Sequence, residues 1–143
     1  MRPPTENDVV SAVERHFERH GYTVRQVRRT TERGTDIVAA RRGEVWYVEA
    51  KGGTSSKPHT RRFGKPFNLG QINSHVSRAV FTAMAMVSNP PDGKRTRAAI
   101  AVPDDKGHQA VVGRVAPALR RLGIQILWVT PGREVRVPVK GKR

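Results

Sequence analysis

The chain has 143 residues, no cysteine, and 27 Lys and Arg against 12 Asp and Glu, which gives a formal net charge of +15 at pH 7. This length predicts one domain, the lack of cysteine excludes disulfide scaffolds and thiolate zinc sites, and no apolar run approaches the roughly 18 residues that span a bilayer. We therefore expect a cytoplasmic protein without a membrane partner, whose charge favours a polyanion such as nucleic acid.

The first expected element is a helix that begins at Thr5 and ends at Gly21. Asp8 follows Thr5 by three residues, as in a capping box, and the residues that form the apolar stripe are Val10, Val13 and Phe17. On a helical wheel Glu6 falls in the centre of that stripe, whereas Glu14 lies on its flank. Glu6 either complements the helix dipole or points toward a site beyond the helix end as a third acid.

A strand is expected from 22 to 28, and residues 34–51 then read as a β-hairpin. Both halves alternate between polar and apolar residues, and the turn signal between them is Arg42-Gly43. If Arg41 pairs with Glu44, the same register sets Asp36 opposite Glu49, with Cβ atoms about 5 Å apart. The residues expected on the other, core-forming face are Ile37, Ala39, Trp46, Val48 and Ala50.

The polar face of this hairpin carries Asp36, Glu49 and Lys51. Two carboxylates held so close repel one another, which implies a cation between them. Mg²⁺-assisted phosphodiester hydrolysis needs this set: hard oxygen ligands for the ion, and an ammonium beside the attacking water. We expect Asp36, Glu49 and the Ala50 carbonyl to bind Mg²⁺, or Mn²⁺ in its place, with Lys51 on the side of the water.

A long loop, residues 52–70, follows directly after the acids. Its four cations are Lys57, Arg61, Arg62 and Lys65. Loops of this length are usually functional or disordered, and cations next to a carboxylate pair are suited to holding phosphates. A solvated flexible loop is the alternative.

The next expected helix runs from about 69 to 87. Its expected core stripe consists of Ile72, Val76, Ala79, Val80, Ala83 and Val87, and its flank carries Gln71, His75 and Arg78. This flank is either a polar border or a part of the site that binds nucleic acid. Met84 and Met86 add apolar surface that suits core filling or a dimer contact.

Buried strands are expected at 97–103 and 124–129, with an edge strand near 134–139. Residues 104–107 are expected to form a turn, and a short helix is expected from 115 to 122, with Pro117 in its first turn. The tail from Lys140 onward is basic. The whole chain, 1–143, is therefore interpreted as a single α/β domain, with helices flanking a mixed central sheet.

The order of elements and the spacing of Asp36, Glu49 and Lys51 resemble the PD-(D/E)xK nuclease superfamily, which includes restriction endonucleases and Holliday-junction resolvases. The resemblance covers about residues 5–129, and its αβββαβ core is the fold that it implies. Thr35 stands where the family usually has a proline before the first acid. The context of Gly-Thr-Asp and Val-Glu-Ala-Lys makes the pattern more specific than the spacing alone.

The resemblance also implies residue roles. Asp36 and Glu49 would be the metal-binding acids, Lys51 the catalytic lysine, Glu6 or Glu14 the first-helix acid, and Gln71 a glutamine that some branches carry on the following helix. The implied activity is that of an Mg²⁺-dependent DNA endonuclease, restriction-like or junction-resolving. The cations of the loop, with His75 and Arg78, would bind the DNA backbone, and cutting on both strands would imply a homodimer.

Two other functions are compatible with the composition. One is a catalytically inactive module with a nuclease fold that binds nucleic acid, and the other is a basic structural or ribosome-associated protein. The intact set of two acids and a lysine favours the enzyme over both.

Overall fold

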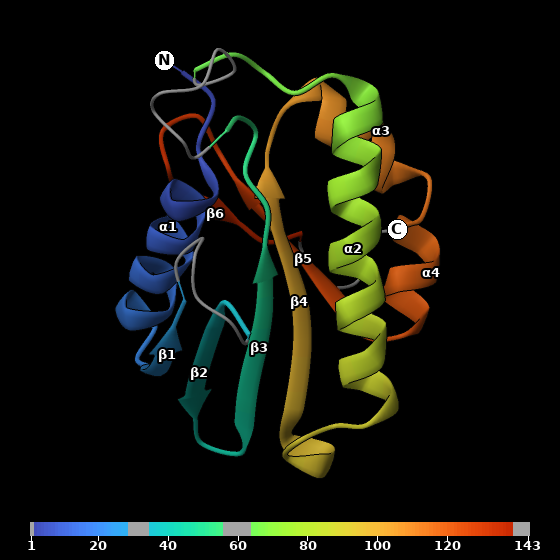
Figure 1. Ribbon diagram of the computed structural model, residues 1–143. Coiled ribbons are helices and arrows are strands. Elements are labelled where there is room, and N and C mark those ends of the chain that lie inside the picture. The colour runs from blue at the N-terminus through green and yellow to red at the C-terminus, as the bar shows by residue number, and fades with distance from the viewer. Residues whose placement is uncertain (1, 29–34, 56–63, 139–143) are drawn as a thin grey trace.

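The structure, a computed structural model, describes residues 2–28, 35–55 and 64–138. It is a six-stranded mixed sheet, in the order β1-β2-β3-β4-β5-β6, with helices on both faces (Figure 1). The elements are α1 (Glu6–Arg19), β1 (Thr23–Val27), β2 (Ile37–Arg41), β3 (Glu44–Ala50), α2 (Leu69–Ser88), a 3-10 turn (Gly93–Arg95), β4 (Thr96–Pro103), α3 (Lys106–Gly113), α4 (Ala116–Arg121), β5 (Ile124–Val129) and β6 (Val135–Arg136). The αβββαβ core expected from the sequence is thus present.

The sheet changes direction at β3. Strands β1, β2 and β3 pair antiparallel, β3, β4 and β5 pair parallel, and the short β6 returns antiparallel along β5. Parallel strands need a crossover that covers a face of the sheet, and α2 provides it between β3 and β4. As a result β3 ends beside the start of α2.

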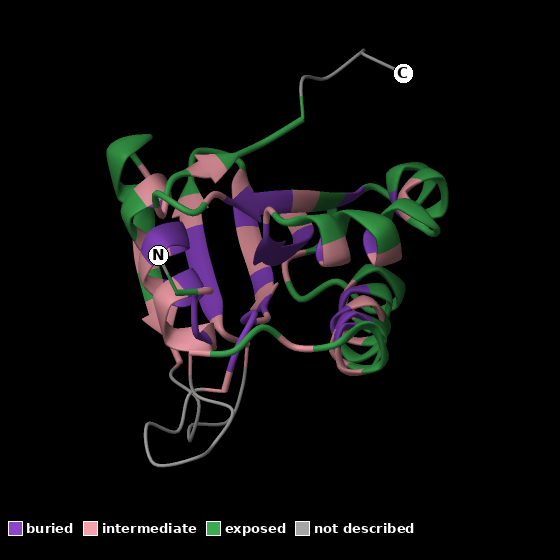
Figure 2. Cartoon of the chain, turned by 90° about the horizontal axis from the view of Figure 1, so that it is seen from above, coloured by how far each residue is buried: buried purple, intermediate pink, exposed green. Residues whose placement is uncertain are grey.

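Two apolar layers hold the helices to the sheet, and Figure 2 shows buried residues on the sheet and on the inward sides of α1 and α2. One layer joins α1 to the face that carries Ile37, Val48 and Ala99. The opposite layer joins α2, α3 and α4 to β4 and β5 and consists of Ile72, Val76, Ala79, Ala83, Ala98, Ile100, Val102, Val112, Leu119, Ile124 and Trp128. Side chains of β3 that pack in neither layer do not serve the core and can form part of a functional site.

Two expectations about the second half of the chain are wrong. Residues 106–113 form α3 instead of continuing a turn, because the Asp105 side chain caps the helix by accepting a hydrogen bond from the His108 N–H at 2.8 Å. Val87, expected in the core stripe of α2, is 37% exposed. None of the helices in the described residues combines the length and hydropathy needed to cross a membrane.

Candidate active site

The β2–β3 hairpin sets the geometry of the candidate site. Arg41 pairs with Glu44 and Ile37 with Val48, so the register predicted from the sequence is confirmed. Asp36 directly precedes Ile37, and Glu49 directly follows Val48. Continuing the ladder by one step sets the two acids opposite each other, on the face of the sheet away from α1.

Hydrogen bonds fix the two carboxyl groups of this pair. The backbone N–H of Ala50 donates to Asp36 Oδ2 at 2.8 Å, and the Asp36 and Glu49 side chains are hydrogen-bonded to each other. A hydrogen bond between two carboxyl groups requires one proton. The pair is therefore able to share one proton at the end of β3.

The pKa of Glu49 identifies the acid that keeps the proton. Burial raises the pKa of Glu49 to about 8, the charge of Asp36 adds to this rise, and Lys51 opposes it. Burial also raises the pKa of Asp36, while its hydrogen bond from Ala50 and the charge of Lys51 act in the opposite direction. The hydrogen bond from Ala50 and the charge of Lys51 thus favour the ionised form of Asp36, whereas burial and the charge of Asp36 favour the protonated form of Glu49.

Glu6 of α1 joins the same cluster. Burial raises the pKa of its carboxyl group, the charge of Asp36 raises it further, and Lys51 lowers it. The Glu6 charge in turn contributes to the raised pKa of Glu49. Glu14, the alternative first-helix acid, lies eight residues further along α1, about 12 Å along the helix axis. Glu6 is therefore within electrostatic reach of the acid pair.

Gly52 and Gly53 explain how the start of α1 reaches the end of β3. A Cβ atom on Gly52 would lie 2.3 Å from the backbone nitrogen of Glu6, so no side chain fits there. The N–H of Gly53 donates to the Pro4 carbonyl at 2.7 Å, and its own carbonyl accepts from Phe67 N–H at 3.0 Å. These contacts join β3 to the segments that begin α1 and α2.

Gln71, His75 and Arg78, the residues expected on the flank of α2, differ in their surroundings and in how close they lie to Lys51. Gln71 completes a capping box, because its Oε1 accepts from Asn68 N–H at 2.9 Å while the Asn68 side chain accepts from Gln71 N–H. His75 packs edge-on against Phe67, and burial followed by the charge of Lys51 lowers its pKa. His75 is therefore close to Lys51, whereas Arg78 is exposed one turn further on.

The loop cations are only partly described. Lys65 is exposed in the segment before α2. Lys57, Arg61 and Arg62 lie outside the described residues.

A pair near the site, the buried His108 and the exposed Asp105, was missed in the sequence analysis. His108 is 1% exposed, its Nδ1 lies 2.9 Å from Asp105 Oδ1, and its charge is one cause of the lowered pKa of His75. The available signal was the spacing of Asp105 and His108, in which an aspartate at a helix start faces a side chain three residues on. It was obscured because Asp104, Asp105 and Gly107 together favour a turn.

The donor atoms of the cluster suit Mg²⁺. Among the residues that the structure describes, no group of three or more His, Cys, Asp or Glu side chains stands ready to hold a metal ion. Mg²⁺ does not need such a group, because it usually retains several waters and binds one or two carboxylates together with substrate phosphates. Asp36 and Glu49 are two oxygen donors of this kind.

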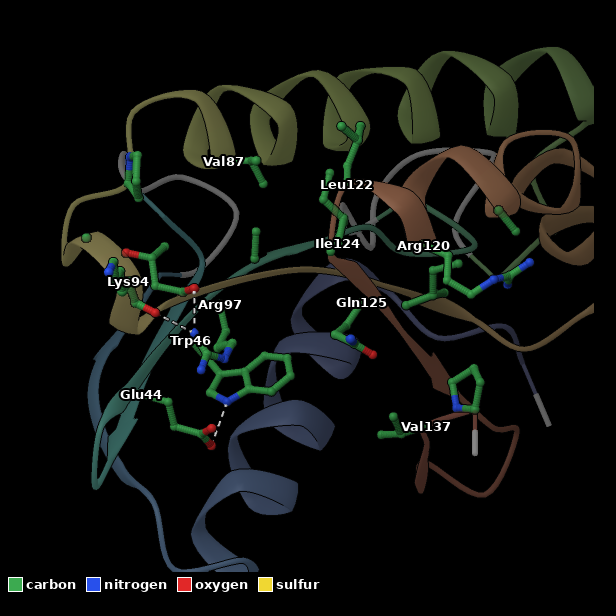
Figure 3. A pocket seen from close by; sticks show the side chains of 18 residues that line it. Glu44, Trp46, Val87, Lys94, Arg97, Arg120, Leu122, Ile124, Gln125 and Val137 are labelled. Atoms are coloured by element: carbon green, nitrogen blue, oxygen red, sulfur yellow. Dashed lines mark hydrogen bonds between the residues drawn. The ribbon is translucent and has the colours of Figure 1, made fainter. Parts of the chain in front are cut away.

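A hollow of about 870 Å³ at the N-terminal ends of β4 and β5 is a separate feature (Figure 3). Trp46, Leu122 and Ile124 are among its lining residues. Trp46 precedes Glu49 by three residues on β3, about 10 Å along the strand, and its side chain lies on the face of the sheet opposite to that of Glu49. The acid cluster, not this hollow, has the groups that hydrolysis needs.

Comparison with known families finds a match over more than half of the chain. A family model described as restriction endonuclease, Mrr_cat, matches residues 5–87. This range runs from the N-cap of α1 to the last turn of α2 and contains Glu6, Asp36, Glu49 and Lys51. A search of curated proteins finds no match.

Proposed function

We propose, because the chain belongs to the restriction endonuclease family and so to the PD-(D/E)xK nucleases, that it is a metal-dependent endonuclease hydrolysing phosphodiester bonds in DNA. The observation that carries this proposal is the half-buried pair of Asp36 and Glu49, which the β2–β3 register sets opposite each other beside Lys51. Like charges so close need a cation, and the chain's net charge of +15 favours a polyanionic substrate. We treat residues 1–143 as one nuclease domain.

Asp36, Glu49 and the Ala50 carbonyl would hold Mg²⁺, or Mn²⁺ as a substitute. When bound, the ion would polarise the phosphate and acidify a water molecule. Glu49 must then lose its proton, because a carboxylate binds the ion and a carboxylic acid does not. The affinity for metal is consequently expected to rise with pH up to about 8, where Glu49 titrates.

Lys51 has two roles in this proposal. Its ammonium orients the attacking water by hydrogen bonding and offsets negative charge that develops on the phosphate oxygens. Its influence on the pKa of Glu6, Asp36 and Glu49 supports a position within reach of all three acids. Glu6 assists from α1 by adding negative charge to the metal site.

The residues around the acids would bind the substrate. His75, whose lowered pKa favours the neutral imidazole at pH 7, donates or accepts a hydrogen bond beside Lys51. Arg78 and Lys65, with the loop residues Lys57, Arg61 and Arg62, contact phosphates. Gln71, implied by the resemblance as a catalytic glutamine, acts in our proposal through its cap at the start of α2.

A second copy of the chain would supply the cut on the other strand of a duplex. The exposed apolar residues of α2, Phe81 at 75% and Met84 at 44%, are the surface we propose for a homodimer.

The alternative function is an inactive nuclease-fold module that binds nucleic acid. It would need the basic surface but neither the metal nor Lys51. Calorimetry with Mg²⁺ or Mn²⁺ separates the two proposals, because an enzyme should take up metal and Asp36→Asn should abolish that uptake.

The test of activity is a cleavage panel on linear, branched, single-stranded and modified DNA, with RNA duplex as comparison, in Mg²⁺ and in Mn²⁺. Lys51→Ala is expected to lower the rate about 10²- to 10³-fold on whichever substrate is cut. Arg121→Ala, which removes a charge of the same sign from the exposed end of α4, is the matched control and should cut like the wild type. Equal activity of the Lys51 variant and the wild type would contradict the proposal.

A further inference from the structure

A shallow groove of about 380 Å³ lies at the turn of the β2–β3 hairpin. Its lining residues are Thr23, Arg25, Ala40, Arg41, Arg42, Gly43, Glu44, Val45 and Arg95. Four of these are arginines and one is an acid, so the groove is strongly positive. None of them belongs to the proposed active site.

The register of the sheet sets this groove on the face that carries the acid pair. Ala40 pairs with Val45, and in each strand alternate residues share a face, so Ala40 faces the same way as Asp36 and Val45 the same way as Glu49. Four residues separate the two sites along each strand. At about 3.3 Å per residue this corresponds to roughly 13 Å.

The four arginines differ in what they contact. Arg41 is held by the His20 carbonyl at 2.7 Å and lies 4.2 Å over the Tyr22 ring. Arg95 lies 3.5 Å from Asp92.

Arg25 and Arg42 are both exposed, and within the described parts of the chain neither has an ion pair or a side-chain hydrogen bond. Arg25 is close enough to Tyr47 to lower the pKa of its hydroxyl, although burial and Asp92 dominate and raise it. Like charges that gather without acids of their own are stabilised when an anion binds between them.

We propose that this groove, through Arg25 and Arg42, binds a backbone phosphate of the nucleic acid that is cut at Asp36 and Glu49, so that the substrate lies along β3. The inference rests on the proposed nuclease function. A duplex advances about 3.4 Å per base pair, so 13 Å corresponds to about four base pairs between the contacted phosphate and the cleaved bond. Phosphate contacts position a substrate without reading its sequence.

The test is binding of a fluorescein-labelled 30-base-pair DNA duplex to the full chain, by anisotropy in chelator across a range of salt. Removing both charges, with Arg25→Gln and Arg42→Gln, is expected to weaken binding about 10-fold or more and to lower the slope of log affinity against log salt by about one to two. Arg25→Lys with Arg42→Lys keeps the charges and should stay within about threefold of the wild type.

The matched control removes the same charge from α4, with Arg120→Gln and Arg121→Gln, both exposed. It should change the slope by less than about 0.5, since α4 packs on the far part of the sheet. Equal loss in the control and groove variants, or no loss in the groove variants, would overturn the inference. A chain that binds in this way but never cuts would count against the nuclease function and leave the groove intact, because the assay contains no metal.

Discussion

The proton on Glu49 links the stability of the fold to its chemistry. In the free protein this proton relieves repulsion among Asp36, Glu49 and Glu6, which burial would otherwise intensify. The unfolded chain has no such repulsion, and there Glu49 titrates near its ordinary value of 4.5. A residue that favours catalysis therefore opposes folding once it ionises.

The expected consequence is a loss of stability with rising pH in chelator. A pKa raised in the folded state means that the folded protein binds more protons than the unfolded one, so this contribution is complete below about pH 4.5 and is lost by about pH 8. Glu49→Gln cannot ionise, and we expect its melting temperature to exceed that of the wild type at pH 9 but not at pH 4. Thermal denaturation followed by circular dichroism at both values measures the difference.

Glu18→Gln is the control for this prediction, because Glu18 is exposed on α1. It should follow the wild type at every pH. A Glu49 variant that also follows the wild type at pH 9 would mean that Glu49 is already ionised without strain.

For individual residues, the sequence predicted which acids lie opposite each other but not which of them favours the protonated form. Strict alternation and a two-residue turn are enough to oppose Asp36 and Glu49. The proton depends on burial, which follows from packing of distant elements. The choice between Glu6 and Glu14 likewise depended on where α1 begins relative to β3, a tertiary distance that helix periodicity does not contain.

The starts of three helices pack against one end of the sheet, and two glycines, Gly52 and Gly53, allow this close approach. Strands β3 and β4 finish where α1, α2 and α3 begin (Figure 1). Gly53 accepts and donates backbone hydrogen bonds there, and Gly52 has the Glu6 backbone in the space of its absent side chain. Helix starts carry partial positive charge, so this end also favours phosphate.

We expect Gly52→Ala to displace the start of α1. The added methyl group would lie 2.3 Å from a backbone nitrogen, which cannot move aside as the end of a flexible side chain can. Overpacking of this kind lowers the free energy of unfolding by about 3 kcal/mol, or the melting temperature by about 10 °C. Glu6 should move with the helix, so the cleavage rate should fall as well.

The control is Gly113→Ala, at the end of α3, where an added Cβ has no atom within 4 Å. It should leave melting temperature and cleavage unchanged or slightly raise the former, since alanine favours a helix over glycine. A Gly52 variant as stable as this control would show that α1 can adjust without cost.

Helices and strands with strong patterns were predictable, and α3 was not. The caps at Thr5 and Asp8 and the turn at Arg42-Gly43 are local signals that tertiary contacts reinforce. Residues 104–113 contain turn formers, and the cap that the Asp105 side chain provides to the His108 N–H turns them into a helix. Val87 was assigned to the core by periodicity, but it lines the hollow at the N-terminal ends of β4 and β5 and stays exposed there.

For the whole molecule, charge is distributed unevenly over the surface. The chain carries +15, and yet residues 79–91, from the second half of α2 to the following turn, contain no charged residue. Phe81, Met84 and Val87 are exposed within this stretch. A surface meant for nucleic acid would carry cations, so this one suits protein contact.

We expect two copies of the chain to associate through this uncharged part of α2. Two molecules of +15 repel over distances comparable to the Debye length, about 10 Å at 0.1 M salt, whereas apolar contact depends little on salt. Sedimentation equilibrium should therefore give a dimer whose affinity rises with salt, the opposite of the trend for DNA binding.

Phe81→Glu should remain monomeric at every salt concentration, because its charge would be desolvated at the contact. Leu69→Glu, at another apolar and exposed position in the first turn of the same helix, should still dimerise. A wild-type chain that stays monomeric at high salt would contradict association through this surface.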